Sequence, residues 1–448
     1  MGPICVIGLG YIGLPTAVIL SCHGYSVIGV DRNAEVLLEL SRGNTHLKEP
    51  SLGTLIKQVI DRGILHLEST PKPADVFIIA VPTPNKSDKS CDLDFVLQAV
   101  NGILPLLSER NLIVIESTVP PMTCEDVIKP LIEQTGLQVG KDIFLAHCPE
   151  RVMPGQIMKE ITENDRVIGG YSEECAIKAA AVYKTFTTGE ITLTDLRSAE
   201  MIKLMENTYR DVNIALANEM AQICDRLGID VLKAIKMANK HPRVDFLWPG
   251  PGVGGHCLAV DPYFIIEKAP DLALLIAQAR KINKAMPAYI AKKTQWLLAG
   301  IESPNICVFG VSYKGNVEDT RESPALEIIQ LLKLEGFQLS EYDPHVVIDG
   351  QAKDPVQAVR GADLLLILTD HAEFKSLDYA GLAKEMRTPM VFDTRGIVKA
   401  EDDLAEYVSL YNLGSVFKIS VPEPEILNSP IKNRLKRVIT TNFSTSRL

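Results

Sequence analysis

The sequence lacks an excess of basic residues. Its 46 lysines and arginines are outnumbered by 56 aspartates and glutamates, which gives a formal net charge of −10. Proteins that hold nucleic acid through its phosphates carry a basic surface excess. We therefore expect no nucleic-acid partner, although a helix N-terminus or a single cation can still bind a phosphate group.

The sequence also lacks paired cysteines and long apolar runs. Nine cysteines are scattered from Cys5 to Cys307 without a Cys-x-x-Cys pair, which argues against a disulfide framework or a zinc ribbon and favours a reducing compartment. The apolar run 4–20 contains three glycines and a proline and has no basic leader. No other run approaches the roughly 18 apolar residues of a membrane span. We expect a cytoplasmic protein without a metal site or membrane insertion.

What is present is a globular composition. The chain has 448 residues, of which 46% are hydrophobic and 23% charged. At about 100–200 residues per domain, this length predicts two to four domains with sizeable cores.

Apolar runs alternate with helical patterns in the N-terminal part. Runs that are apolar throughout are typical of parallel strands covered on both faces, so the pattern predicts a doubly wound α/β domain. The expected strands are 4–8, 26–31, 75–81, 112–116 and 143–147.

The pattern changes in the middle of the chain. Residues 195–241 have helical periodicity and are interrupted at Gly228, which predicts a long helix and a second one. Such a helix either forms a dimer seam or packs between domains. Strands return at 305–310, 338–343, 363–368 and 390–393.

The predicted fold is α/β, with two doubly wound Rossmann-like domains joined by a central helical domain that contains the long helix. The expected boundaries are 1–190 for the first Rossmann-like domain, 191–295 for the helical domain, 296–420 for the second Rossmann-like domain, and 421–448 for a flexible basic tail.

A glycine-rich turn follows the first expected strand and opens a helical pattern. Gly8 permits a tight turn, Gly10 allows a pyrophosphate to approach the backbone, and Gly13 allows close packing of helix and strand. Asp31 ends the second strand and favours NAD over NADP, although Arg32 beside it weakens that preference. Ligands bind beyond the carboxyl ends of parallel strands, where two threonines also follow strands. The expected cofactor contacts are Gly8, Gly10, Tyr11, Ile12, Gly13, Asp31, Arg32, Thr83 and Thr118.

A second glycine-rich segment surrounds Cys257, so that its sulfur can closely approach a ligand. If a helix begins near Gly255, Cys257 lies in its first turn and Asp261 lies one turn further on the same face. A thiolate near a carboxylate suits covalent capture of a carbonyl carbon. A single cysteine is, however, more often an inert buried residue.

Three further side chains are candidates for catalysis. Lys203 and Asn207 share one face of a helix and can hold an oxyanion, although a solvated helix face explains most such pairs. Glu150 follows the fifth strand and is a candidate base for a water molecule. By contrast, Tyr289 and Lys293 match the Tyr-x-x-x-Lys pair of short-chain dehydrogenases, but they lie too far from the glycine-rich turn, and we reject that assignment.

Seven motifs stand in one order along the chain: Gly8-x-Gly-x-x-Gly13, Val81-Pro-Thr-Pro84, Glu116-Ser-Thr118, Pro149-Glu-Arg151, Lys203-x-x-x-Asn207, Gly254-Gly-x-Cys257-x-x-x-Asp261 and Ser312-Tyr-Lys314. This order resembles the UDP-glucose/GDP-mannose dehydrogenase family up to about residue 396. Within the family, segments 148–156, 206–213, 241–244 and 249–257 look most like the branch that acts on UDP-N-acetyl-D-mannosamine. Segment 393–396 is more typical of the glucose and glucosamine branches.

The resemblance implies a four-electron oxidation of a sugar hydroxymethyl group to a carboxylate with two NAD in sequence. It implies that Cys257 forms a thiohemiacetal and then a thioester, which water releases with the help of Glu150. Lys203 and Asn207 would stabilise the oxyanion, and Asp261 would order a water or assist proton removal. Thr118 would lie near the reacting centre.

The resemblance also implies a substrate site and an assembly. The C-terminal α/β domain would bind UDP, with Lys314 and Arg395 near the nucleotide sugar. Arg243 would reach the substrate of a neighbouring subunit in a homodimer or a dimer of dimers. The expected substrate contacts are Glu150, Arg151, Val152, Lys203, Asn207, Arg210, Arg243, Gly254, His256, Tyr313, Lys314 and Arg395.

Three alternatives stay open. UDP-N-acetylglucosamine or UDP-glucose can replace UDP-N-acetyl-D-mannosamine as the substrate. A two-electron hydroxyacid dehydrogenase shares the Lys-x-x-x-Asn helix, but it leaves the third domain and Glu150 unexplained. An NAD-bound sensor without turnover needs no reactive cysteine.

Overall fold

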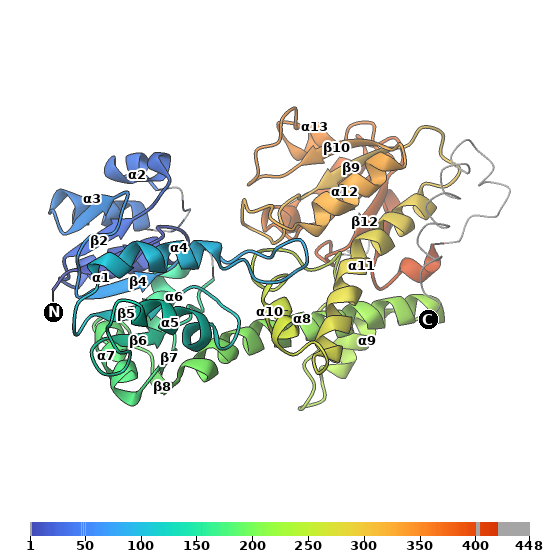
Figure 1. Cartoon of the computed structure of the whole chain (residues 1–448). Coiled ribbons are helices and arrows are strands. Elements are labelled where there is room, and N and C mark those ends of the chain that lie inside the picture. The colour runs from blue at the N-terminus through green and yellow to red at the C-terminus, as the bar shows by residue number, and fades with distance from the viewer. Residues whose placement is uncertain are drawn as a thin grey trace. The chain divides into compact units, whose positions relative to one another are not determined.

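The computed structural model describes residues 2–45, 47, 49, 51–153, 155–399 and 404–419. Its contacts divide the chain into two compact units (Figure 1). Unit 1 comprises Met1–Tyr209 and Val260–Ala277, and unit 2 comprises Arg210–Ala259 and Gln278–Leu448. The predicted tail, 421–448, lies outside the described residues.

Unit 1 is built on an eight-stranded sheet with the order β3-β2-β1-β4-β5-β6-β7-β8. Neighbouring strands are parallel except for the antiparallel pair β6–β7. The chain order reverses between β1 and β4, the point at which open α/β sheets bind ligands. The strands are β1 Ile4–Ile7, β2 Val27–Val30, β3 Leu65–Glu68, β4 Val76–Ile79, β5 Leu112–Ile115, β6 Phe144–His147, β7 Arg166–Gly170 and β8 Ile191–Asp195.

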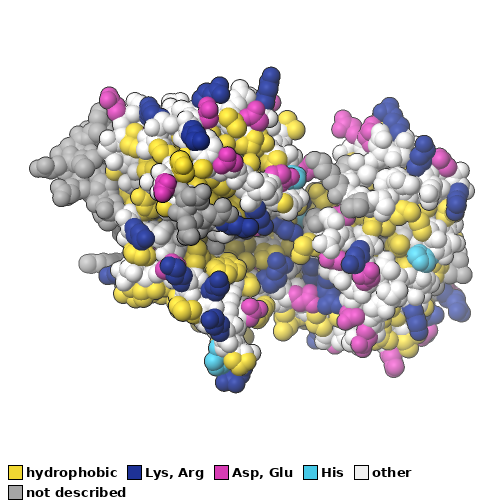
Figure 2. Space-filling view, turned by 180° about the vertical axis from the view of Figure 1, so that it is seen from behind, with side chains coloured by type: hydrophobic (Ala, Val, Ile, Leu, Met, Phe, Trp, Pro, Cys, Tyr) yellow, Lys and Arg dark blue, Asp and Glu magenta, His cyan; other side chains and the backbone are white. Residues whose placement is uncertain are grey.

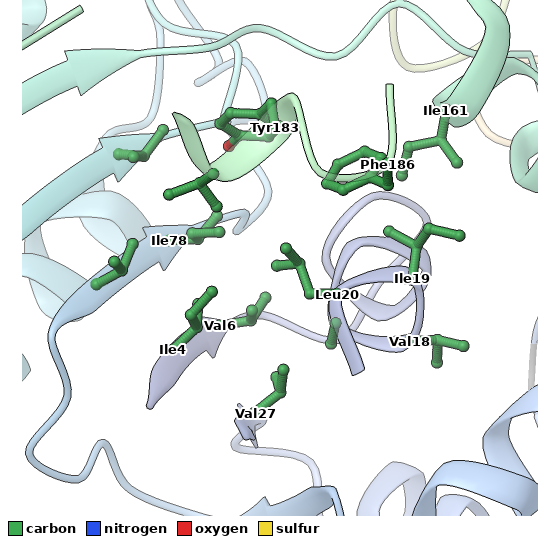
Figure 3. Close-up of a cluster of buried hydrophobic side chains, with 14 of the residues drawn as sticks. Ile4, Val6, Val18, Ile19, Leu20, Val27, Ile78, Ile161, Tyr183 and Phe186 are labelled. Atoms are coloured by element: carbon green, nitrogen blue, oxygen red, sulfur yellow. The ribbon is translucent and has the colours of Figure 1, made fainter. Parts of the chain in front are cut away.

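Both faces of this sheet are covered, which explains why its central strands are apolar throughout. Ile4 and Val6 of β1 belong to the cluster that includes Leu20, whereas Cys5 and Ile7 belong to the cluster on the opposite face. Figure 3 shows the first of these clusters. Alternate side chains of a strand point to opposite faces, so each face has its own core.

The helices of unit 1 lie between these strands in the chain, except for the last one, which follows β8. They are α1 Gly13–Cys22, α2 Ala34–Ser41, α3 Leu52–Asp61, α4 Asp94–Ile103, α5 Lys129–Glu133, α6 Ile157–Glu163, α7 Glu173–Tyr183 and α10 Asp261–Lys268.

Unit 2 contains a five-stranded parallel sheet with the order β10-β9-β11-β12-β13. Its core is divided in the same way, with Ile306 and Val308 on one face and Cys307 and Phe309 on the other. The strands are β9 Asn305–Phe309, β10 Gln338–Tyr342, β11 Leu364–Ile367, β12 Met390–Asp393 and β13 Ser409–Asn412. The helices are α9 Val231–Ala238, α11 Leu274–Leu297, which begins in unit 1, α12 Pro324–Leu334, α13 Pro355–Val359, α14 Tyr379–Ala383 and α15 Leu404–Tyr407.

The predicted long helix is confirmed as α8, Leu196–Leu227, and α9 follows it. Gly228 adopts a left-handed backbone conformation, with φ of 72°, which is favourable for glycine at a helix end. Helix α8 contributes residues to both units. The predicted α/β fold, with two Rossmann-like sheets and a helical region in the middle of the chain, is confirmed, whereas its boundaries at 190, 295 and 420 stay predictions.

Within the part of the chain that the structure describes, no helix combines the length and the apolar character that crossing a membrane requires. Basic and acidic side chains are interspersed on the face shown in Figure 2, so the acidic excess is not gathered into one patch there.

Candidate functional site

The turn after β1 has the geometry that its three glycines predict. A Cβ atom on Gly8 would come within 2.6 Å of the carbonyl oxygen of Ala80, and one on Gly13 would come within 1.8 Å of the carbonyl oxygen of Gly8. A Cβ on Gly10, however, would meet no described atom within 4 Å. The outer two glycines therefore allow packing, and the middle one leaves space for a ligand.

Helix α1 begins in this turn and presents its N-terminus there. Among the described side chains none caps it, and its first turn contains no acidic residue. Backbone N–H groups at a helix N-terminus favour an anion. Tyr11 and Ile12 immediately precede the helix, and Tyr11 packs against the core of this unit.

Asp31 is held beside the same turn. Its carboxylate accepts a hydrogen bond from the Leu9 N–H at 2.9 Å and another from the Asn33 N–H at 2.8 Å. Arg32 is exposed and pairs with Gln98. The acid that we predicted to bind a ribose thus lies next to the glycine turn.

The loops after β4 and β5 are joined to each other. Thr83 donates from Oγ to the carbonyl oxygen of Thr118 at 2.6 Å, and Ser117 donates from Oγ to the carbonyl oxygen of Val81 at 2.7 Å. Because β4 is the neighbour of β1 and β5 is the neighbour of β4, the first loop follows the strand next to the glycine turn and the second follows the strand beyond it.

Glu150 is buried against a cation that the sequence did not indicate. Its carboxylate lies 2.8 Å from the Arg166 guanidinium, and it also accepts a hydrogen bond from the Arg151 N–H at 2.8 Å. Arg166 is buried as well and donates to the Thr187 hydroxyl at 3.0 Å. Any water that Glu150 activates must therefore bind a carboxylate that is already paired with the Arg166 guanidinium.

Glu116 is a second buried carboxyl; it begins the Glu116-Ser-Thr118 motif, but the sequence indicated no role for it. It accepts from the Tyr183 hydroxyl at 2.7 Å and from the Thr16 hydroxyl at 3.2 Å. Burial, together with the nearby Glu150 carboxylate, raises the pKa of Glu116 to about 7.

Helices α8 and α10 bring two predicted catalytic residues together. The Asn207 amide donates to Oδ2 of Asp261 at 2.6 Å, and both side chains are buried. Lys203 lies one turn before Asn207 on α8 and is half-buried. Arg151 pairs with Glu206 at 2.5 Å, next to Asn207 in the sequence. Val152 is partly buried against the core of unit 1.

The helix predicted near Gly255 begins later than we expected. Helix α10 starts at Asp261, so Cys257 lies in the turn before it and not in its first turn. Gly255 has a left-handed backbone, with φ of 84°, and Pro262 favours the start of a helix. Cys257 is half-buried in unit 2, whereas Lys203, Asn207 and Asp261 belong to unit 1.

The glycines before Cys257 allow a close approach to another loop of unit 2. A Cβ on Gly254 would come within 2.3 Å of the carbonyl oxygen of Glu322, and one on Gly255 would lie 2.6 Å from the Tyr313 ring. The structure thus brings the predicted substrate residues Gly254 and Tyr313 into contact. Lys314 follows Tyr313 and is half-buried.

His256 lies beside two charged residues that the sequence did not indicate. Its Nδ1 is 3.5 Å from Oδ2 of Asp319 and 3.0 Å from the Arg321 guanidinium. Burial disfavours the charged imidazole, but hydrogen bonds with Asp319 and Cys257 outweigh it and raise the pKa of His256 to about 9.

Arg395 also lies in this part of unit 2. Its guanidinium is 2.9 Å from the Asp370 carboxylate, and a Cβ on Gly250 would lie 2.9 Å from its Nη1. Arg210 and Arg243 are exposed, and the Arg243 N–H donates to Nδ1 of His241 at 3.3 Å.

The rejected pair Tyr289 and Lys293 has a structural role. Both side chains bind Asp225 of α8, with the Tyr289 hydroxyl at 2.9 Å and the Lys293 ammonium at 2.7 Å. These contacts join α11 to α8 within unit 2.

Comparison with known proteins identifies three family domains in order. Three models of the UDP-glucose/GDP-mannose dehydrogenase family match this chain. The model of the NAD-binding domain matches residues 2–187, that of the central domain matches 197–285, and that of the UDP-binding domain matches 307–400. The residues of the glycine turn lie in the first match, Cys257 in the second, and Tyr313, Lys314 and Arg395 in the third.

Individual relatives cover nearly the whole chain. A UDP-N-acetyl-D-mannosamine dehydrogenase from Methanococcus maripaludis is 48% identical over 406 residues, covering 88% of this chain and 93% of the relative. An NDP-N-acetyl-D-galactosaminuronic acid dehydrogenase from Ralstonia nicotianae is 42% identical, covering 89% and 96%. The structure of the UDP-N-acetyl-mannosamine dehydrogenase of Staphylococcus aureus is 48% identical, with a TM-score of 0.88, over 94% of this chain and all of that one.

Proposed function

Because this chain belongs to the UDP-glucose/GDP-mannose dehydrogenase family, and is thus an NAD-dependent UDP-sugar dehydrogenase, we propose that it oxidises the C6 hydroxymethyl of UDP-N-acetyl-D-mannosamine to a carboxylate. The sequence identity of 48% to two dehydrogenases of that sugar supports this choice of substrate. The observation that carries the four-electron reaction is Cys257, placed in a glycine-rich turn beside His256 and the Tyr313 loop.

The residues after β1 fit NAD. The space at Gly10 and the uncapped N-terminus of α1 suit a pyrophosphate, and Asp31 suits the hydroxyls of a ribose. NAD supplies the hydride acceptor. We assign cofactor binding to Gly8, Gly10, Tyr11, Ile12, Gly13, Asp31, Arg32, Thr83 and Thr118.

Cys257 supplies the covalent step. An aldehyde has no carbinol hydrogen that can leave as hydride until a nucleophile adds to its carbon. The thiolate of Cys257 adds to that carbon and the oxygen takes up a proton, which gives a thiohemiacetal; loss of a hydride and a proton then gives a thioester. Water attacks the thioester and releases the carboxylate and the thiol. The raised pKa of His256 places a cationic imidazole beside the Cys257 sulfur.

The other catalytic residues stabilise charge and move protons. We assign Lys203 and Asn207 to the oxyanion that forms when the thiolate or water adds. Asp261 orients the Asn207 amide through their 2.6 Å hydrogen bond. Glu150 is the proposed base for water, and Thr118 lies near the reacting carbon.

The substrate side chains carry mostly positive charge, which complements a diphosphate. Lys314 and Arg395 bind the nucleotide, and Arg243 reaches the substrate of a second subunit in a homodimer. The further contacts that we assign are Arg151, Val152, Arg210, Gly254, His256 and Tyr313.

Replacement of the nucleophile tests this mechanism. We expect Cys257→Ser to lower the rate of carboxylate formation from UDP-N-acetyl-D-mannosamine by at least about three orders of magnitude, because no thioester forms. Mass spectrometry of the nucleotide-sugar products measures that rate. Cys224→Ser is the matched control, since Cys224 is also a half-buried free thiol of unit 2.

Two results would contradict the proposal. If Cys257→Ser formed the uronate at the rate of Cys224→Ser, the thioester would be wrong. If the wild-type protein oxidised UDP-glucose but not the N-acetylated sugar, the proposed substrate would be wrong and the reaction class would stand.

A further inference from the structure

A buried polar cluster lies beneath the loop that contains Tyr313 and Lys314. His371 and Asp343 are 0% and 1% exposed, and Ser312 is 2% exposed. His371 lies beyond the end of β11, and Asp343 follows β10. The proposed reaction does not use any of these three side chains.

The hydrogen bonds of His371 assign its tautomer. The backbone N–H of Asn316 donates to Nδ1 at 2.9 Å, and an N–H group can only donate, so Nδ1 carries no proton. The proton therefore lies on Nε2, which is 3.0 Å from Oδ2 of Asp343 and 3.3 Å from Oγ of Ser312. Ser312 accepts there because its own hydroxyl donates to the Lys314 carbonyl oxygen at 2.8 Å.

Other bonds hold the same loop against the segment that contains His371. The Thr369 hydroxyl donates to the Ser312 carbonyl oxygen, and the Ala372 N–H donates to Oδ1 of Asn316, each at 2.8 Å. Asn316 has a left-handed backbone, with φ of 62°, which is uncommon for a residue with a side chain. His371 thus contacts the loop 312–316 at both ends, through Ser312 and through the Asn316 N–H.

This loop presents side chains that we assign to the nucleotide. The ring of Tyr313 lies against Gly255, and Lys314 is held by its carbonyl oxygen through Ser312. A lysine binds a diphosphate well only where its backbone is fixed at the correct distance, since ordering a mobile loop opposes binding.

A metal ion is a poor alternative for this cluster. One atom each of His345, His371 and Glu373 lie within 4.8 Å of one another, which is a metal-like arrangement. However, Nδ1 of His371 accepts from Asn316, and Nε2 carries the proton given to Asp343. His371 therefore has no lone pair for a metal ion unless the loop is released.

We propose that His371 is a positioning residue that holds the loop 312–316, and with it Lys314, in the conformation that binds the uridine diphosphate part of the substrate. The proposal rests on the proposed function, because that function places the nucleotide at Lys314. His371 acts through the Asn316 N–H and through Ser312, and it does not touch the substrate.

Two variants of His371 test separately its hydrogen bond with the Asn316 N–H and its hydrogen bond with Asp343. In His371→Asn the amide oxygen takes the place of Nδ1 and keeps the acceptor for Asn316. In His371→Gln the amide nitrogen takes the place of Nε2 and keeps the donor to Asp343, but the Asn316 N–H loses its acceptor. Both variants remove the same buried imidazole, so each is the control for the other.

We expect His371→Gln to weaken UDP binding, measured by calorimetry, at least about tenfold, and to raise KM for the UDP-sugar by the same factor. His371→Asn should stay within about threefold of the wild type. The kcat and the Kd for NAD should change less than twofold in both. If His371→Gln does not fold, Ser312→Ala should weaken UDP binding several-fold without removing the pairing of His371 with Asp343.

Three results would overturn the proposal. Unchanged UDP binding in folded His371→Gln, or in Ser312→Ala when that variant replaces it, would remove the positioning role. Equal losses of UDP and NAD binding in both His371 variants would make His371 a general stability residue. If the wild-type protein bound NAD but not UDP, the proposed function would fall and this inference with it, whereas the first two results leave the proposed function standing.

Discussion

Burial and a close partner act in opposite directions on His256. Its side chain is 36% exposed, and partial burial by itself would favour the neutral imidazole. The Asp319 carboxylate and the Cys257 sulfur reverse that preference. The charge at this position is therefore a property of the local cluster, and it comes with a measurable dependence of stability on pH.

The pKa of His256 predicts how the free energy of unfolding changes with pH. The folded-state pKa of about 9 is above the ordinary value of 6.5, so the folded protein binds the proton more tightly than the unfolded chain. The resulting stabilisation is complete below about pH 6.5 and is lost as the pH rises through about 9. We expect the wild-type protein to lose its stability advantage over His256→Gln across this range, as measured by urea unfolding.

The control for this prediction is Asp319→Asn, which keeps the imidazole but removes its anionic partner. Its stability should fall less steeply than that of the wild type between pH 6.5 and pH 9. A stability difference between wild type and His256→Gln that does not change with pH would contradict the raised pKa.

At the scale of elements, each of the two Rossmann-like sheets has an aspartate directly after its second strand in chain order, and the two aspartates differ in burial. Asp31 follows β2 and accepts from Leu9, and Asp343 follows β10 and accepts from the Val311 N–H at 2.8 Å. Asp343 is also covered by His371, whereas Asp31 is only half-buried. Asp343 is therefore less accessible to a ligand than Asp31.

Alanine substitutions of two glycines at the start of α1 should have different effects, one on stability and the other on NAD binding. Gly13→Ala places a Cβ 1.8 Å from the Gly8 carbonyl oxygen, so it should lower the free energy of unfolding by about 1–3 kcal/mol or more. Gly10→Ala meets no described atom within 4 Å, so it should change stability by less than about 0.5 kcal/mol. Its Cβ should instead weaken NAD binding at least about tenfold.

Urea unfolding and NAD titration of the two variants check this contrast. Normal NAD binding by Gly10→Ala would mean that the pyrophosphate does not lie against this turn. A Gly13→Ala protein as stable as the wild type would mean that helix α1 and strand β1 separate easily.

The sequence predicts the elements whose side chains are buried on both faces. Strands β1, β4 and β5 are apolar throughout, and their pattern is unambiguous. Strands β3, β8 and β13 were missed because they lie at or near a sheet edge and mix polar with apolar residues. Strand β7 was missed because it begins at Arg166 and ends in two glycines.

Site residues are predictable where they lie within a motif, and their partners are not. Cys257, Asp31 and Asn207 each belong to a short pattern with a chemical reason. Arg166 and Asp319 contact Glu150 and His256 from 16 and 63 positions away in the sequence, through folding that no local pattern encodes. The Asn207–Asp261 contact likewise joins residues 54 positions apart.

At the scale of the whole molecule, helix α8 carries an exposed apolar stripe in unit 2. Leu216, Ile223 and Leu227 are 38%, 42% and 65% exposed and are spaced by seven and four residues, which places them on one face. Apolar faces of this kind are typical of an interface between subunits.

We expect a homodimer that uses this stripe. Light scattering after size-exclusion chromatography should give twice the chain mass of 49.2 kDa for the wild-type protein and one chain mass for Ile223→Glu with Leu227→Glu. Ile177→Glu is the control, because the exposure of Ile177, 51%, lies between those of Ile223 and Leu227, but Ile177 lies on α7 of unit 1. A wild-type monomer at micromolar concentration, or a dimer of the double variant, would contradict this interface.

We propose that this one protein oxidises a UDP-sugar from the alcohol to the acid through a thioester on Cys257. The amount of NADH formed per mole of UDP-N-acetyl-D-mannosamine consumed by the purified protein tests it most directly. A four-electron oxidation predicts about two NADH per sugar, with a uronate as the product. A ratio of about one, with an aldehyde as the product, would contradict the thioester mechanism. The enzyme would then be a two-electron alcohol dehydrogenase.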